Sequence, residues 1–465
     1  MGSWATGLDI AFRALQAQQQ AIDVANHNIA NANTPGYSRQ VAHFAATPPA
    51  ALINVSGGIG QTGTGVVVTD IERSRSVFTD YQIRGETQSL GQWEKMSESM
   101  KQVEVVFNEP SDSGLNDLMS RFWQSWQELT NNPQDAGARR ALVEQSDSLA
   151  MAFNRNYSQL TAIQQDVDRQ IALETSQINE MAQRISTLNV KIGQAELLGQ
   201  RANDLRDQRD LVMNDLSKMV KVTYYEASGG SVNVFLGSRS LVVMDRVDAL
   251  ANGLNPSGFA TVIWASDGSD ASITNGELYG LSHARDVEIP TFLNDLQSLA
   301  SGFIASVNAL HRVGFGLDNS TNLPFFDGTD ASDIAINAVL ATNPEKVAAA
   351  SAANSSGDNS VALSIAQLQN APTMNGNTTD FGQFFASMMS RLGVDSQRSE
   401  MMAGNQKLLV DHLSKQRDTL SGVSLDEEMT KLIEYQRAYE AAARVVNVVD
   451  EMLDKLINGT GMVGR

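Results

Sequence analysis

The fold of this chain is decided by two stretches at its ends, LDIAFRALQAQQQAIDVANHNIAN (residues 8–31) and LDEEMTKLIEYQRAYEAAARVVNVVDEMLDKLI (residues 425–457). Apolar residues recur in both at intervals of seven, which keeps one seam of a helix facing a partner helix and favours a coiled coil. At ~1.5 Å per residue the helices would be roughly 35 Å and 50 Å long. The repeat positions are Leu8, Leu15, Ile22, Ile29, Leu425, Leu432, Tyr439, Val446 and Leu453.

A second register widens the apolar stripe of the C-terminal stretch, at Tyr435, Ala442, Val449 and Leu456. Such a stripe fits an ordinary helical hairpin within one chain, or a specific helix-pairing role, which a repeat of more than three heptads favours. Isolated helices of this kind are marginal in water, so we expect both ends to be largely disordered in the free monomer and to order on assembly.

Composition narrows the class of protein. A chain of 465 residues is too long for one small core, so two or three domains are expected. Asp and Glu number 53 against 34 Lys and Arg, a net charge of −19 that disfavours binding to nucleic acid or to anionic lipid. The sequence also has no run of eighteen apolar residues, so we expect no membrane insertion.

Cysteine is absent, which excludes disulfides and cysteine metal sites. The first twenty residues have no basic start, and Asp9 and Arg13 interrupt their apolar positions, so they do not form a secretory signal peptide. The sequence therefore predicts either a cytosolic protein or one exported without a cleaved leader.

The hydrophobic period divides the rest of the chain. Residues 138–198 carry a sustained helical stripe, residues 116–130 place Trp123 and Trp126 on an apolar side, and Ser228-Gly229-Gly230 joins two strand-like runs as a hairpin. We therefore predict a mainly α fold with an inserted all-β domain, elongated and nested, with the small antiparallel β domain at the far tip. The expected parts are a terminal coiled-coil domain (1–40 and 421–465), an extended hairpin-like linker (41–85), a long helical bundle (86–221 and 286–420) and the β insert (222–285).

Three patterns raise the question of chemistry, and each has a better structural interpretation. Gly58–Gly63 has dinucleotide-loop spacing, but no strand precedes it and no helix follows. Ser282-His283 resembles half of a nucleophile elbow without a base oriented by a carboxylate. The acidic loop 318–333 lacks the glycine and the final glutamate of a calcium loop. We therefore expect no catalytic residue, no cofactor and no metal site.

The residues after the first helix carry a resemblance to a known family. Asn28-Ile-Ala-Asn-Ala-Asn-Thr-Pro-Gly-Tyr-Ser-Arg-Gln40 resembles the N-terminal motif of the flagellar rod, hook and hook-associated proteins, in its hook-associated form. Ser421–Glu428 and Tyr435-Gln-Arg-Ala-Tyr439 are similar to the other end of the same family, and Gly276–Leu281 and Phe325–Gly328 agree between them. The motif positions are Asn28, Asn31, Thr34, Pro35, Gly36, Tyr37 and Arg39.

The resemblance implies a non-enzymatic, structural role outside the cell. It implies export unfolded through the flagellar type III apparatus and self-association into a ring that joins hook to filament. The implied partners are the hook protein, the next hook-associated junction protein and an export chaperone at the C-terminal helical region. Three alternatives stay open: a rod or hook subunit, a cytosolic coiled-coil scaffold, and a hydrolase using Ser282.

Overall fold

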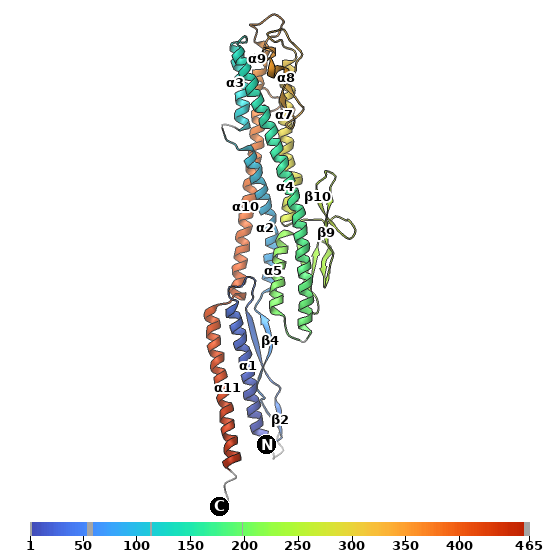
Figure 1. The fold of residues 1–465 in the computed structure, drawn as a ribbon. Helices are drawn as coiled ribbons and strands as arrows, with labels where there is room; N and C mark the ends of the chain where they lie inside the picture. The colour runs from blue at the N-terminus through green and yellow to red at the C-terminus, as the bar shows by residue number, and fades with distance from the viewer. Residues whose placement is uncertain (1, 54–58, 112–113, 198, 460–465) are drawn as a thin grey trace, which may run out of the picture.

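The computed structural model describes residues 2–53, 59–111, 114–197 and 199–459. These residues form an elongated, mainly helical rod (Figure 1). A π-helical turn, Ala284–Glu288, joins α6 (Glu277–His283) to α7 (Ile289–His311), and short 3-10 turns lie at Pro344–Lys346 and Leu368–Asn370. The helices are α1 (Gly2–Ala30), α2 (Val77–Phe107), α3 (Leu115–Asn131), α4 (Ala136–Glu196), α5 (Asn203–Met219), α6 (Glu277–His283), α7 (Ile289–His311), α8 (Ala338–Thr342), α9 (Ser360–Gln367), α10 (Phe381–Ser421) and α11 (Leu425–Gly459).

The bundle of α2, α3, α4, α7 and α10 contains the main hydrophobic core. Most of the predicted stripe of α4 is buried, from Leu160 to Ile192. Aromatic rings fill the upper bundle, where Phe122 lies 4.8 Å from Trp123 and Phe303 lies 4.9 Å from Phe381 between ring centroids. Because each large ring buries well over 100 Å² and Trp126 is fully buried, this cluster is a major source of the bundle's stability.

The inserted β region holds two antiparallel sheets. One has the order β5 (Val222–Glu226), β6 (Val232–Leu236), β7 (Arg239–Val243) and β8 (Arg246–Val247), and the other pairs β9 (Leu250–Leu254) with β10 (Ala260–Trp264). The predicted β5–β6 hairpin turns at Gly229 and Gly230, whose φ values of 86° and 77° suit glycine. The expectation that this insert lies at the far tip is wrong, because it packs on the flank of the bundle against α4 (Figure 1).

Asparagine side chains on α4 explain that position. Asn179 exchanges two hydrogen bonds of 2.8 Å with the backbone of Leu250. Asn189 does the same with Val232, at 2.8 and 2.9 Å. Both asparagines belong to the second half of α4, on the side of the terminal helices. The far tip is built instead by α8, α9 and the loops around β11 (Phe326–Asp327) and β12 (Ala335–Ile336).

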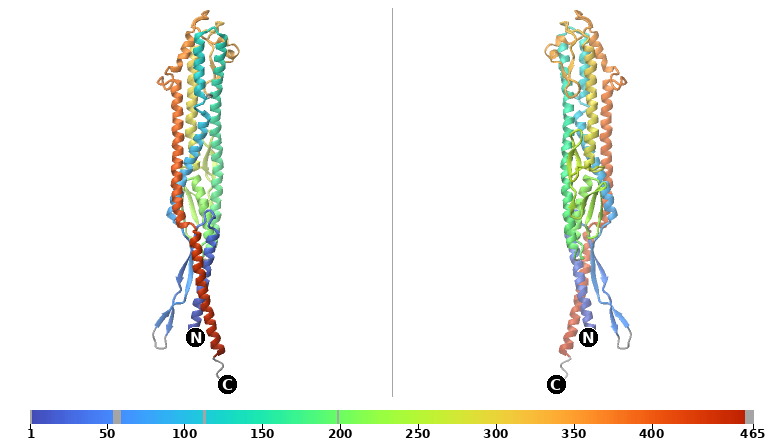
Figure 2. Two further views of the ribbon diagram at one scale, coloured as in Figure 1. Left: turned by 90° about the vertical axis from the view of Figure 1, so that its left-hand side faces the viewer. Right: turned by 90° about the vertical axis from the view of Figure 1, so that its right-hand side faces the viewer.

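At the opposite end, α1 and α11 lie side by side and both chain termini emerge there (Figures 1 and 2). A β ribbon accompanies them: β1 (Gln40–Ala46) pairs with β4 (Val66–Arg73), and β2 (Ala50–Ile53) pairs with β3 (Ile59–Thr62). The expected extended stretch 41–85 is therefore too long, because α2 already begins at Val77. Ser76 Oγ caps that helix by accepting from Thr79 N at 3.3 Å, and Asp80 lies in the first turn.

Candidate functional site: a polar joint beside the terminal helices

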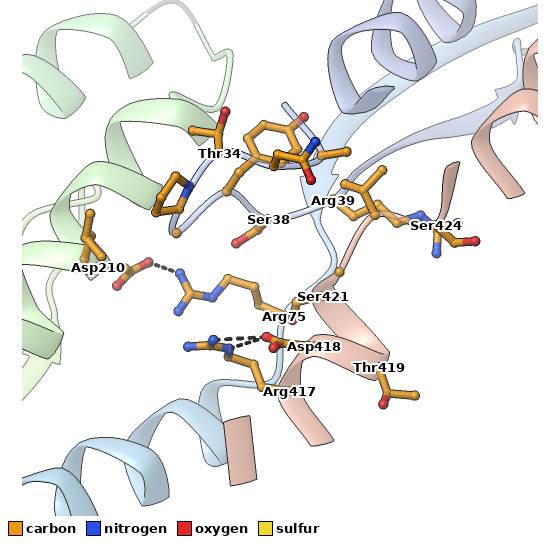
Figure 3. Close-up of a pocket in the computed structure, with 18 of the residues that line it drawn as sticks. Thr34, Ser38, Arg39, Arg75, Asp210, Arg417, Asp418, Thr419, Ser421 and Ser424 are labelled. Carbon is orange, nitrogen blue, oxygen red and sulfur yellow. Dashed lines mark hydrogen bonds and ion pairs between the residues drawn. The ribbon is translucent and has the colours of Figure 1, made fainter. Parts of the chain in front are cut away.

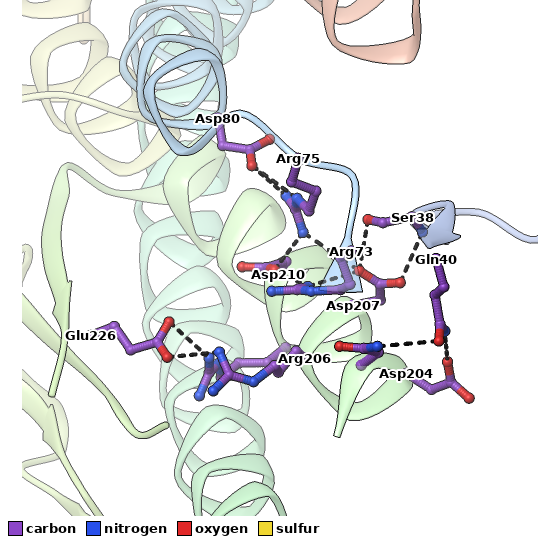
Figure 4. A network of polar contacts seen from close by, with 12 residues as sticks. Ser38, Gln40, Arg73, Arg75, Asp80, Asp204, Arg206, Asp207, Asp210 and Glu226 are labelled. Atoms are coloured by element: carbon purple, nitrogen blue, oxygen red, sulfur yellow. Dashed lines mark hydrogen bonds and ion pairs between the residues drawn. The ribbon is translucent and has the colours of Figure 1, made fainter. Parts of the chain in front are cut away.

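The segment Thr34–Gln40 lies where the terminal helices meet the bundle. It connects α1 to β1. Ser38 contacts α5 (Figure 4), and Arg39 contacts the start of α11. We call this region the joint, and define it by the motif residues together with their charged partners. Those partners are Arg73, Arg75, Asp80, Arg84, Asp204, Asp207, Asp210, Glu427 and Glu428.

Asn28 is the centre of the joint on the side of the terminal helices. Its side chain is completely buried, and each polar atom has two partners. Nδ2 donates to the Gln40 carbonyl at 2.9 Å and to Glu428 Oε2 at 2.8 Å. Oδ1 accepts from Tyr37 Oη at 2.7 Å and from Gln40 N at 2.9 Å. An amide offers two donors and two acceptor lone pairs, so no other side chain of this shape satisfies all four contacts.

Arg39 ties the same glutamate to the motif. Its Nε donates to Glu428 Oε1 at 2.9 Å, its Nη1 lies 3.5 Å from Glu427 Oε2, and its backbone N donates to the Ser421 carbonyl at 2.9 Å. Glu428 is 2% exposed, so this is a buried charge pair whose loss would leave an uncompensated carboxylate. Both ends of the chain are therefore needed to build the joint.

The turn itself uses the remaining motif residues. Asn31 Nδ2 donates to the His27 carbonyl at 3.0 Å, and Thr34 Oγ1 donates to Asn31 Oδ1 at 3.1 Å. Pro35 and Gly36 then reverse the chain, with Gly36 at a φ of 79° that favours glycine. Burial, together with the nearby Asp204, Asp207 and Glu428 carboxylates, raises the pKa of Tyr37, so its hydroxyl stays a donor to Asn28.

Three arginines and two aspartates fix the joint to the bundle. Asp207 accepts from Ser38 N and Ser38 Oγ, both at 2.8 Å, and from Arg73 at 2.8 Å. Asp210 binds Arg73 at 2.7 Å, Arg84 at 2.9 Å and Arg75 (Figure 4). Burial alone would raise the pKa of Asp210, but the three guanidinium groups outweigh it and hold that pKa well below its usual range.

This charged group was not among the residues predicted from the sequence. Its one local signal is the spacing of Asp204, Asp207 and Asp210, three residues apart on one side of α5. The arginines that face them come from β4, α2 and the link between the two, more than 120 positions away.

A polar cleft opens beside the joint, between the motif turn and the end of α10 (Figure 3). Its volume is about 620 Å³, and Thr34–Arg39, Arg75, Arg417 and Ser424 are among its lining residues. Ser421 Oγ in its wall is buried and has no hydrogen-bond partner within the described part of the chain. Beside the cleft, the link from β4 to α2 contacts the end of α10, where Ser74 Oγ donates to the Leu420 carbonyl at 2.8 Å.

The heptad positions of α1 do not form the main contact with α11 and the ribbon. Among its described side chains, the buried ones are small, apart from Asn28: Ala11, Ala17, Ala21 and Ala25. Leu8 is 40% exposed, and Leu15, Ile22 and Ile29 are half-buried along the edge of that contact. Small residues let the neighbouring backbone approach closely, and this leaves the larger row beside the seam.

The heptad positions of α11 also divide into half-buried and exposed side chains. Leu432, Val446 and Leu453 are half-buried, whereas Leu425 and Tyr439 are exposed. The second register lies deeper, since Val449 is buried. Further apolar side chains of α11 are exposed on other sides of the helix: Met429, Ile433, Val445, Val448 and Met452.

The three chemical patterns have structural roles. Ser282 Oγ donates to the Leu278 carbonyl at 2.8 Å inside α6, so it is not held for attack by a base. In the acidic loop, Asp318 pairs with Lys346, and Asp333 accepts from the backbone of Thr329 and Asp330. Ile59–Thr62 is β3, whereas Gly58 lies outside the described residues.

Neither a metal cluster nor a membrane span emerges from the described residues. No three of their His, Asp and Glu side chains gather as metal ligands would. Across the four described ranges, no helix is both long enough and apolar enough to cross a bilayer.

The chain is an elongated helical subunit whose two ends meet at a buried Asn–Glu–Arg contact. One of these ends carries a rod-and-hook type motif. Together these features define the class as the axial structural proteins of the bacterial flagellum. Family comparison supports this class over most of the chain. Residues 8–37 match the flagella basal body rod protein family, residues 417–459 match the C-terminal family of flagellar basal body rod FlgEFG proteins, and residues 100–326 match the helical domain of flagellar hook-associated protein FlgK.

Individual relatives define the family more narrowly. Flagellar hook-associated protein 1 of Bacillus subtilis is 33% identical over 507 residues, covering 100% of both chains. The Escherichia coli protein of the same name is 26% identical, over 96% of this chain and 98% of its own. The chain therefore belongs to the flagellar hook-associated protein 1 family, and it is a structural, hook-associated component of the bacterial flagellum.

A solved structure shares the fold. The flagellar hook junction protein FlgK from Burkholderia pseudomallei superposes with a TM-score of 0.64, covering 73% of this chain and all of that one, at 15% identity.

Proposed function

We propose that this chain is a subunit of a ring at the junction between hook and filament, with its terminal helices in the inner wall and its bundle outside. The observation that carries the proposal is the apolar surface left open at the joined ends. Apart from Asn28, the buried side chains of α1 are alanines, while Leu8, Phe12, Leu425, Met429 and Ile433 are each at least 40% exposed. Apolar side chains in that number on a narrow helix pair favour contacts with further copies.

The terminal helices of a free subunit would be weakly held. Among its described side chains, α11 buries only Glu428 and Val449 below one-tenth exposure, so little apolar burial offsets the entropy of ordering the helix. We infer that α1 and α11 order fully only in the assembled ring. A chain without cysteine and with loosely held ends would also suit export in an unfolded state.

The remaining partners follow from the same geometry. The hook protein and the next junction protein would contact opposite ends of the ring. The export chaperone would cover the C-terminal helical region before export, because its apolar side chains, such as Leu408, Met429 and Ile433, are exposed in a single copy. We also propose that the terminal, ribbon, bundle and β parts act as separate units in the assembly.

Val446→Asp tests the ring. It puts a charge on the half-buried side of α11, so hook ends should carry little of this variant and few filaments. The midpoint of urea unfolding of the bundle should be unchanged. Asn447→Asp adds the same charge at the exposed neighbouring position and should assemble normally. Normal filaments on Val446→Asp cells would contradict the proposal. Amide exchange on the monomer should also be faster at residues 8–31 and 425–455 than at 140–196.

A further inference from the structure

Beyond Leu392, α10 carries a row of apolar side chains that the described residues of one copy leave exposed. Val394, Met401 and Leu408 are 59%, 57% and 70% exposed, and they recur at intervals of seven. Fourteen residues of helix are ~21 Å long, so the row forms one continuous ridge. The upper half differs, because Phe381, Phe385, Met388 and Leu392 are buried in the bundle, whereas residues 400–420 include no buried side chain.

A groove between α2 and α4 offers an apolar floor. Val105, Val106, Ala162 and Ile163 line it, and Val105 is 76% exposed. Its volume is about 660 Å³. Leu173, 63% exposed, follows three turns beyond Ala162 and so extends the same side of α4 downwards.

The ridge and the groove lie at the same height along the rod. Lys101 Nζ contacts Glu400 Oε1 at 2.7 Å, and Ser396 Oγ donates to Glu104 Oε2 at 3.1 Å, which aligns this part of α10 with the groove-lining part of α2. The two surfaces face different directions, because α10 packs on α2 and α7 whereas the groove lies between α2 and α4. Neighbouring copies standing side by side in a ring would present them to each other.

Charge on the two surfaces also matches. Arg398 lies between Val394 and Met401 on the exposed side of α10, one turn from each. The groove is bordered by Glu98 and Asp166, which pair at the surface with Lys95 and Arg169 of the same copy, and by Lys101, which pairs with Glu400. An exposed guanidinium on the ridge would therefore meet carboxylates at the edge of the groove, which favours one partner and one register.

We propose that the α10 ridge of each copy (Val394, Met401, Leu408) docks into the α2–α4 groove of the next copy. This inference rests on the ring proposed above and names its lateral contact within the bundle. The contact is heterologous, with different surfaces on the two copies, which is the kind that closes into a ring when the rotation between copies fits.

Single-cysteine variants test this contact in the full chain, because the sequence has no cysteine of its own. Cells would co-express Met401→Cys and Val105→Cys, and their hook ends would be treated with a short bismaleimide. We expect a cross-linked dimer that neither variant gives alone. Its yield should be about tenfold higher than that from cells that co-express Met401→Cys and Val313→Cys. Val313 is a suitable control because it is 67% exposed but lies beyond the end of α7, near the far tip.

A second variant checks the energetics. Met401→Asp should lower occupancy of hook ends about tenfold without changing the melting of the monomer, whereas Val313→Asp should do neither. Two outcomes would overturn this inference alone, provided that the wild-type chain occupies hook ends. One is that the Met401→Cys and Val105→Cys pair gives no specific cross-link, and the other is that Met401→Asp occupies hook ends fully. Absence of the wild-type chain from hook ends would overturn the proposed ring and this contact together.

Discussion

Asn28 Nδ2 lies 2.8 Å from Glu428 Oε2, joining two residues that are 400 positions apart. The contact is buried, and Arg39 holds the other oxygen of the same carboxylate. One end of the chain therefore cannot adopt its final geometry without the other. The arrangement couples folding of α1 to folding of α11 in a protein whose terminal helices have few other buried contacts.

Replacing Asn28 by Asp should separate the two ends while leaving the bundle folded. The change keeps the size of the side chain but removes both Nδ2 donors and places a second carboxylate beside Glu428. Loss of a buried donor costs about 1–3 kcal/mol, and the added repulsion increases this. Amide exchange in α1 and α11 should rise, with the exchange of α4 unchanged.

The matched control for that prediction is Asn26→Asp, two residues earlier on the exposed side of α1. It introduces the same charge away from Glu428, so exchange in α11 should match wild type. Equal protection of α11 in Asn28→Asp and wild type would show that the Asn28 contact does not hold the ends together.

Replacing Asp210 by Asn should loosen the attachment of the joint to the bundle. Three arginines would lose a shared buried carboxylate, and such a loss typically costs about 3–5 kcal/mol. Because the pKa of Asp210 is held below its usual range, its stabilising effect is complete above an unfolded value of about 4 and is lost only as the pH falls through the lower folded value. The deficit measured by urea unfolding should thus be equal at pH 5 and pH 8.

Asp215→Asn is the control for Asp210→Asn, since Asp215 lies on the same helix with an exposed side chain. Partial desolvation by neighbouring groups nevertheless raises the pKa of the Asp215 carboxyl, so neutralising it should not destabilise the protein. A wild-type urea midpoint for Asp210→Asn would contradict the network described here.

The helices could be predicted because their cause is local. Spacings of three and four along α4 determine which side is buried, and the switch to period two marks the β insert. Proline and glycine at positions 35 and 36 locate the turn. The start of α2 was missed, since its capping residue Ser76 follows a strand-like run and the following Val77 and Phe78 are exposed rather than part of an apolar stripe.

The joint could be predicted only in part. The resemblance identified Asn28, Tyr37 and Arg39, but no local pattern links Arg73 to Asp207, which are 134 positions apart. The position of the β insert was also out of reach, because it depends on two asparagines of α4 that read as ordinary polar residues of a helix. Long-range polar contacts of this kind leave no periodic signal in one sequence.

His311 should make the far tip sensitive to acid. Its ring is buried between the Leu323 carbonyl, 2.8 Å from Nδ1, and the N–H of Ala348, which donates to Nε2 at 2.9 Å. Burial lowers the pKa of His311 to about 4, from an ordinary value of 6.5. The unfolded state then binds more protons between these values, so stability should fall by up to about 3 kcal/mol as the pH drops from 6.5 to 4.

Trp126 can report this change, because its ring centroid lies 6.5 Å from that of His311. Urea unfolding followed by tryptophan fluorescence should show the loss in wild type and in His412→Gln, whose histidine is exposed on α10. His311→Gln should be less stable at pH 7 but should lack the slope between pH 6.5 and 4. A slope that survives in this variant would assign the acid sensitivity to other groups.

Glu174 should produce a pH dependence of the opposite sign in the middle of the bundle. It is 7% exposed, its Oε2 has no hydrogen-bond partner among the described residues, and Lys95 Nζ lies 3.8 Å from Oε1. Burial, with the neighbouring Glu277 carboxylate, raises the pKa of Glu174 from 4.5 to about 7. The folded state then binds the extra proton, so stability should fall by up to about 3 kcal/mol as the pH rises from 4.5 to 7, and stay low above it.

Glu174→Gln should remove this loss, because the amide resembles the protonated carboxyl in shape and carries no charge at any pH. The variant should match wild type near pH 4.5 and exceed it at pH 8 in urea unfolding. Glu180→Gln, on the exposed side of the same helix, should follow wild type throughout. If Glu174→Gln were instead less stable than wild type at pH 8, the charged carboxylate would be stabilising the bundle through Lys95, and the buried site would favour the ion pair over the proton.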